Sequence, residues 1–219
     1  MAYPTVDKPY GLKPINLIGG QVFAGSTRQR RIASGASSIG YGDPLQFASD
    51  GTVEVTTSTT TAPVAGFAGV FLGCNFVSSV TGQPTYSQSW ISGTAVKAGT
   101  YIVAYVVDDP DTLFKAVGVT ASLVVSTTGG FEYTSIGLNV ALVANTLNTT
   151  TNDSQQGLLV GSAATTRSLP MRIIDVVEDT AFVSSGTVYY PEVIVKFNAP
   201  YVNSGTLEGG HAYNNPTGL

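Results

Sequence analysis

The chain has 219 residues, of which 11% are charged and 43% are hydrophobic, and its formal net charge is −4. A disordered chain combines low hydrophobicity with high charge, so this composition excludes general disorder. Exposed helix faces are normally filled by Glu, Lys, Arg and Gln, and the low charge therefore argues against an all-helical protein. The acidic balance also argues against nonspecific binding of nucleic acid through a basic surface.

Residues 1–20 are expected to form an extended N-terminal arm. Pro4, Pro9 and Pro14 recur every five residues, and each removes a backbone donor and favours an extended conformation at the preceding residue. Apolar residues lie among the prolines: Tyr10, Leu12, Ile15, Leu17 and Ile18. Such a segment buries little against itself, so we expect it to lie over its own domain or to pack on a neighbouring molecule.

Residues 21–119 are predicted to form a β core. Short apolar or alternating segments are separated by turn signals such as 41–44 and 49–52, which favours strands over helices. The clearest strand is 100–107, and the Gly-containing apolar run 65–76 favours a buried strand. Further strands are expected at 21–24, 27–33, 45–48, 53–55 and 113–119.

Residues 120–166 are rich in Ser, Thr, Gly, Asn and Ala, and they are predicted to form a loop-rich lobe or insertion with a few strands. The β core is expected to continue over residues 167–198, with strands at 171–177, 181–184 and 193–198. Residues 199–219 are expected to form a C-terminal tail. Frequent turn signals fit a mainly β fold, namely a β-sandwich or barrel-like domain with extended N- and C-terminal arms.

Cys74 and His211 are the only residues of their kinds in the sequence. One cysteine cannot form a disulfide within its own chain, and one cysteine with one histidine cannot complete a zinc site made of those ligands alone. We expect no metal and no cofactor. The first residues lack the basic and apolar regions of a signal peptide, and no apolar run approaches about 18 residues. These features predict a cytoplasmic origin and no contact with a membrane.

The sequence carries no recognised catalytic signature. It lacks the G-x-S-x-G elbow of hydrolases, the glycine-rich loops that bind phosphates, and the H-E-x-x-H zinc motif. A catalytic triad would have to use His211, which lies in a Gly- and Asn-rich tail, and a Cys–His pair would add Cys74, whose apolar surroundings favour a raised thiol pKa. We therefore expect a protein that is not an enzyme and has no catalytic residue.

Asp108, Asp109 and Asp111 form the most concentrated acidic segment, at the end of a strong strand. With Pro110 among them, they are typical of a solvated turn. A cation site is a second interpretation, although the D-x-D-x-D-G spacing of calcium loops is absent. Catalysis by paired carboxylates is a third.

Arg28, Arg30 and Arg31 form the concentrated basic segment. On a strand, Arg28 and Arg30 share one face and Arg31 points to the other. One interpretation is a charged edge strand that blocks unwanted pairing, and the other is a patch that binds an acidic protein surface through the planar guanidinium groups.

Several stretches resemble the capsid decoration (cement) proteins of tailed bacteriophages, of the type found in cyanobacterial and other aquatic phages. The similarity lies in residues 11–28, 69–74, 106–115, 169–174 and 195–198, which read GLKPINLIGGQVFAGSTR, GVFLGC, VVDDPDTLFK, LPMRII and VKFN. It covers most of the chain and is weakest in residues 120–166.

The resemblance implies a structural virion protein that binds the outer surface of the mature icosahedral capsid. It would stabilise contacts between major capsid protein subunits, after assembly in the host cytoplasm. Related proteins are commonly β-rich and often trimeric, so the resemblance also implies a homotrimer. The capsid-binding residues would lie in the arm and the basic strand: Tyr10, Leu12, Ile15, Leu17, Arg28, Arg30 and Arg31.

Two other functions stay open at this point. One is a phage fibre or adhesin module that binds a host-surface glycan or receptor, because Tyr, Thr and Asn side chains suit sugar stacking and polar recognition. The other is a glycoside hydrolase or depolymerase that uses the Asp108–Asp111 cluster.

Overall fold

The structure is a computed structural model that describes residues 6–212 except 34, 58, 62, 64–65, 144–146, 149, 200, 204–205 and 209. The start of the predicted arm, residues 1–5, and the end of the predicted tail, residues 213–219, lie outside the described residues. The prediction of a mainly β fold is confirmed. Helix in the described part is limited to two 3-10 turns, η1 (Tyr133–Ser135) and η2 (Glu178–Thr180).

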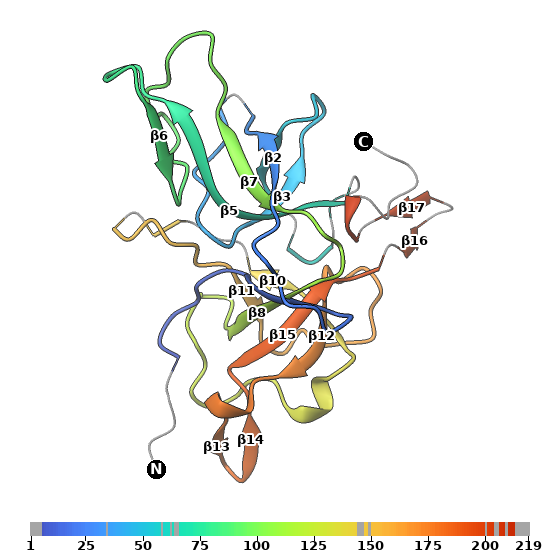
Figure 1. Ribbon diagram of the computed structural model, residues 1–219. Coiled ribbons are helices and arrows are strands. Elements are labelled where there is room, and N and C mark those ends of the chain that lie inside the picture. The colour runs from blue at the N-terminus through green and yellow to red at the C-terminus, as the bar shows by residue number, and fades with distance from the viewer. Residues whose placement is uncertain are drawn as a thin grey trace.

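Seven strands form a barrel-like sheet (Figure 1). Its order is β10-β11-β8-β15-β12-β9, and β1 pairs with β8 outside this path. The strands are β1 (Lys13–Leu17), β8 (Thr112–Val119), β9 (Asn139–Val140), β10 (Leu142–Val143), β11 (Gly157–Leu159), β12 (Met171–Val176) and β15 (Glu192–Phe197). The two ends of the order, β10 and β9, are separated in the chain by Ala141 alone, so the sheet nearly closes on itself.

Six strands form a second sheet, here called the six-stranded sheet, with the order β2-β7-β5-β3-β4 and with β6 paired to β5. The strands are β2 (Arg28–Arg31), β3 (Pro44–Phe47), β4 (Val53–Val55), β5 (Phe67–Val77), β6 (Pro84–Ser87) and β7 (Val103–Val107). Ile32, directly after β2, bridges Val53 of β4, so this sheet also curls towards closure.

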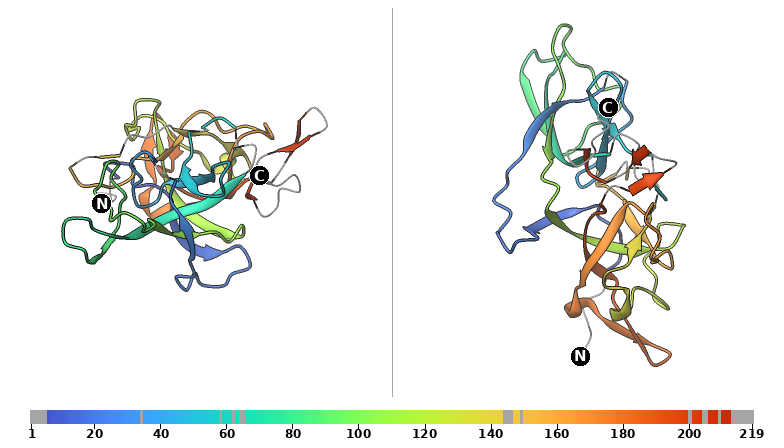
Figure 2. Two further views of the ribbon diagram at one scale, coloured as in Figure 1. Left: turned by 90° about the horizontal axis from the view of Figure 1, so that it is seen from above. Right: turned by 90° about the vertical axis from the view of Figure 1, so that its right-hand side faces the viewer.

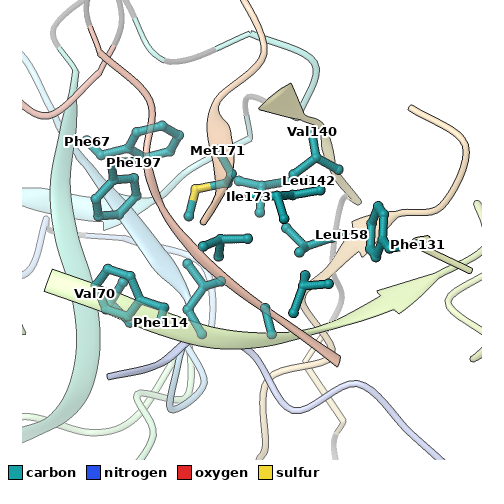
Figure 3. Packing of buried hydrophobic residues seen from close by; sticks show 14 of the residues in the cluster. Phe67, Val70, Phe114, Phe131, Val140, Leu142, Leu158, Met171, Ile173 and Phe197 are labelled. Carbon is teal, nitrogen blue, oxygen red and sulfur yellow. The ribbon is translucent and has the colours of Figure 1, made fainter. Parts of the chain in front are cut away.

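One long strand contributes to the cores of both sheets. The larger cluster of buried side chains fills the barrel-like sheet and includes Phe114 and Phe197, together with Phe67 and Val70 of β5 (Figure 3). The smaller cluster fills the six-stranded sheet and includes Phe71 of β5. Each fully buried Phe side chain contributes about 1.5–3 kcal/mol relative to its exposed state. The shared strand therefore joins the two sheets into one body.

The molecule is elongated, with one sheet towards each end (Figures 1 and 2). At one end project β6, the turn before it and the loop that leads to β7. At the other end projects the hairpin of β13 (Phe182–Ser184) and β14 (Thr187–Tyr189). A separate small hairpin is formed by β16 (Tyr201–Asn203) and β17 (Thr206–Glu208).

Part of the predicted N-terminal arm belongs to the barrel-like sheet. β1 pairs antiparallel with β8, and Leu12 just before it is fully buried. Gly11 and Gly42 have φ angles of 78° and 92°, and a Cβ on Gly42 would lie 2.9 Å from the backbone N of Leu12. Only glycine allows this backbone conformation together with so close an approach. The segment therefore lies over its own domain.

Part of the segment 120–166, predicted as a loop-rich lobe or insertion, is built into the barrel-like sheet. It supplies β9, β10 and β11, and Val140, Leu142 and Leu158 are buried in the larger core (Figure 3). The expectation of a projecting lobe is corrected in this respect. Strands of two or three residues with distant partners leave little periodicity in the sequence.

Candidate functional site

The acidic turn Asp108–Asp111 connects β7 of one sheet to β8 of the other. Oδ2 of Asp108 accepts a hydrogen bond from Arg28 Nε at 2.5 Å and lies 3.6 Å from Nη2 of Arg30. Oδ1 of Asp111 lies 3.1 Å from Nζ of Lys196, and Oδ1 of Asp109 accepts the backbone N–H of Asp111 at 2.8 Å. The three carboxylates thus hold the connection between the sheets in place. This arrangement fits the interpretation of the acidic segment as a turn.

The basic strand β2 uses its two faces differently. Arg28 and Arg30 both reach Asp108, whereas the guanidinium carbon of Arg31 lies 3.6 Å from the centre of the Tyr101 ring. A cation stacked on an exposed aromatic ring contributes about 0.5–1 kcal/mol. Arg31 and Tyr101 therefore form a solvent-facing pair on the surface of the six-stranded sheet.

Tyr10 anchors the segment before β1 to the barrel-like sheet. Its hydroxyl donates a hydrogen bond to Oε1 of Glu192, a buried side chain that also lies 3.0 Å from Nζ of Lys115. Nζ of Lys13 lies 4.0 Å from the centre of the Tyr10 ring. Burial, and then the hydrogen bond to Glu192, raise the pKa of Tyr10 well above its ordinary value. A buried carboxylate needs such partners, and here they hold the segment just before β1 in place.

The predicted capsid-binding residues are divided among several roles. Leu12 has no exposed surface, so its predicted contact with a partner is corrected: it is a core residue of this chain. Tyr10, Arg28 and Arg30 make internal contacts, and Ile15 and Leu17 are half-buried within β1. Arg31 is exposed. The structure therefore does not gather these residues into one exposed patch.

Exposed hydrophobic side chains lie on both sheets' projecting parts and also on connections, where they are Ile18, Val22 and Val124, and the sequence did not reveal them. At the end formed by the six-stranded sheet they are Val80, Tyr86, Ile91 and Tyr101. At the other end they are Tyr133, Val183 and Val188. Residues 182–189 could have signalled this, because apolar side chains occupy both faces of the hairpin: Phe182 pairs with Tyr189, and Val183 pairs with Val188.

The two residues considered for nucleophilic chemistry are buried in different surroundings. Cys74 lies in the core of the six-stranded sheet, and burial raises its pKa to about 11. His211 packs against Phe197 with ring centres 5.8 Å apart, and burial lowers its pKa to about 4. The backbone N–H of Phe67 donates to the carbonyl of Gly210 at 2.8 Å, which holds this part of the predicted tail on β5.

A cavity of about 310 Å³ lies where the end of β15 meets the connections between the sheets. Its lining includes Arg172 and Lys196, the apolar side chains Ile18, Pro110 and Phe197, and His211. This volume is at the lower end of the range for small-molecule sites. Within the described ranges, no cluster of three or more His, Cys, Asp or Glu side chains is arranged to hold a metal ion.

Comparisons with protein-family models, with curated proteins and with solved structures find no match to this chain. In the part of the chain that the structure describes, no helix has the length and apolar character to cross a membrane.

Proposed function

We propose that this chain is a structural virion protein of a tailed bacteriophage, which binds the outer surface of the mature icosahedral capsid as a homotrimer and stabilises contacts between major capsid protein subunits. The observation that carries the proposal is that the two parts projecting from opposite ends of the elongated β body (Figure 1) carry exposed hydrophobic side chains: Val80 on the turn before β6, and Val183 and Val188 on the β13–β14 hairpin. A protein that holds neighbouring subunits together needs an adhesive surface towards each of them. The sequence resemblance to capsid decoration proteins supports the same function.

The exposed side chains have the character of binding contacts. Val80 is 84% exposed in the turn between β5 and β6, and Val183 is 65% exposed on the hairpin at the opposite end. Burying such a side chain contributes up to about 1.5–3 kcal/mol, part of which offsets the entropy lost on association. Weak contacts at two ends, repeated in a trimer, become strong through effective concentration. A protein that binds only the mature lattice stabilises that lattice by mass action.

The test is a binding assay with expanded phage heads that lack this protein. We expect the purified protein to sediment with the heads and to saturate a fixed number of sites. Val183→Asp should weaken binding at least about tenfold, a loss of about 1.4 kcal/mol. Ser185→Asp is the matched control, because it adds the same charge to the same hairpin and leaves Val183 and Val188 in place. Equal binding of both variants, or no sedimentation of the wild type, would contradict the proposal.

The exposed rings of Tyr86 and Tyr101 favour a second candidate, a fibre or adhesin module that binds a host-surface glycan. Aromatic rings with a polar end suit stacking on sugars. Copy number separates the two functions, because a lattice-binding protein follows the symmetry of the shell and is present in hundreds of copies. A quantitative gel of purified particles measures this directly.

A further inference from the structure

The cavity where the sheets meet contains two cationic side chains placed side by side. Arg172 of β12 and Lys196 of β15 are direct partners in the antiparallel register, and both line the cavity. Like charges directly opposite each other on neighbouring strands are destabilising. An arrangement of this kind is relieved when an anion lies between the two cations.

The protein's own acidic side chains offset only part of the repulsion between Arg172 and Lys196. Lys196 pairs with Asp111, whose side chain is 63% exposed, and such exposed pairs contribute little because water screens them. Arg172 forms no ion pair with any residue in the described ranges. Two other acidic residues lie in the connection between the sheets. Asp108 pairs with Arg28 and Arg30, and Asp109 accepts a hydrogen bond from the backbone N–H of Asp111. Arg172, an exposed residue, is therefore the cation of this cavity that has no ion pair within the described ranges.

The walls of the cavity favour a specific contact over a diffuse one. Ile18, Pro110 and Phe197 are apolar, whereas Arg172 is exposed, so a group bound here would contact apolar side chains on one side and water on the other. The planar fork of arginine matches the two oxygens of a carboxylate. A volume of about 310 Å³ accommodates a group of that size.

We propose that this cavity binds a carboxylate group, which Arg172 holds through both oxygens and to which Lys196 adds a second positive charge. The carboxylate belongs to a small free ligand or to an acidic side chain of a partner protein. The inference does not depend on capsid binding, because it rests only on the register, the charges and the shape of the cavity.

The single histidine of the chain makes the test direct. His211 lines the cavity, so its imidazole proton signals in an NMR spectrum report on occupancy at neutral pH. The wild type is titrated with succinate, with inorganic phosphate as a second oxyanion, and with a short acidic peptide with blocked termini. Arg172→Gln removes the proposed fork, and Lys97→Gln, on the loop before β7, is the control that removes one exposed cation elsewhere.

We expect saturable shifts of the His211 signals with succinate at a Kd of about 1 mM or tighter, the weak end of specific recognition. The shifts should be lost in Arg172→Gln and kept in Lys97→Gln. Saturation by the peptide as well assigns the site to an acidic side chain of a partner, and saturation by succinate alone assigns it to a free ligand. Shifts that do not saturate, that are unchanged in Arg172→Gln, or that occur only with phosphate would overturn the proposal.

Discussion

Acidification is expected to destabilise the fold through His211. Its imidazole is 1% exposed, and burial lowers its pKa from 6.5 to about 4, with smaller opposing effects of Asp108 and Asp109. In the unfolded chain the group keeps its ordinary pKa of about 6.5. At about 1.36 kcal/mol for each pH unit, this difference corresponds to about 3 kcal/mol of unfolding free energy.

The direction of this pH dependence follows from the protonation of His211 in the folded and unfolded states. Above about pH 6.5 the imidazole is neutral in both, and His211 adds no pH dependence. As the pH falls from about 6.5 to about 4, the unfolded chain binds a proton that the folded protein does not, so the free energy of unfolding decreases. Below about pH 4 both states are protonated and this contribution levels off.

The assay is urea unfolding followed by the fluorescence of Trp90, the single and buried tryptophan, for the wild type and for His211→Gln. The other titratable groups are the same in both proteins, so the difference between the two isolates His211. Between about pH 7 and about pH 4, the wild type should lose about 3 kcal/mol more unfolding free energy than the variant. Equal losses in the two proteins would refute the reasoning.

Three further outcomes follow from the packing. Gly69→Ala places a Cβ 2.2 Å from the carbonyl oxygen of Val107 at a φ of +131°. Thermal unfolding should show that this variant loses at least about 2 kcal/mol of unfolding free energy. Gly93→Ala, which has open space around it, should lose about 1 kcal/mol. Cys74 should react with Ellman's reagent only after urea unfolding, because it is buried and its pKa is raised to about 11; rapid reaction of the native protein would contradict its placement. Tyr10→Phe should lower the free energy of unfolding by about 1–3 kcal/mol, because it leaves buried Glu192 one partner short, whereas Tyr86→Phe on the surface should change it little.

The sequence predicted the strands whose side-chain pattern is local. The apolar run 65–76 corresponds to β5 (Phe67–Val77), and the strand expected at 100–107 contains β7 (Val103–Val107). In these segments the run of apolar residues and the turn residues beside it are sufficient to predict a strand. The acidic turn after β7 was predicted for the same reason.

Features that depend on distant partners could not be predicted. β11 pairs in parallel with β8, and its three residues carry no period from which that pairing follows. Leu12 lies between Pro9 and Pro14, and nothing next to it in the sequence indicates that Gly42 and the larger core enclose it. The facing of Arg172 and Lys196 depends on the register of β12 and β15, which a sequence does not specify by itself.

The most direct test of capsid binding is a cryo-electron microscopy reconstruction of the mature virion at side-chain resolution. The account predicts this protein on the outer surface of the shell, with the β13–β14 hairpin and the turn between β5 and β6 against capsid subunits or neighbouring copies. A shell without this protein, or one in which both ends and residues 1–31 face solvent, would contradict it.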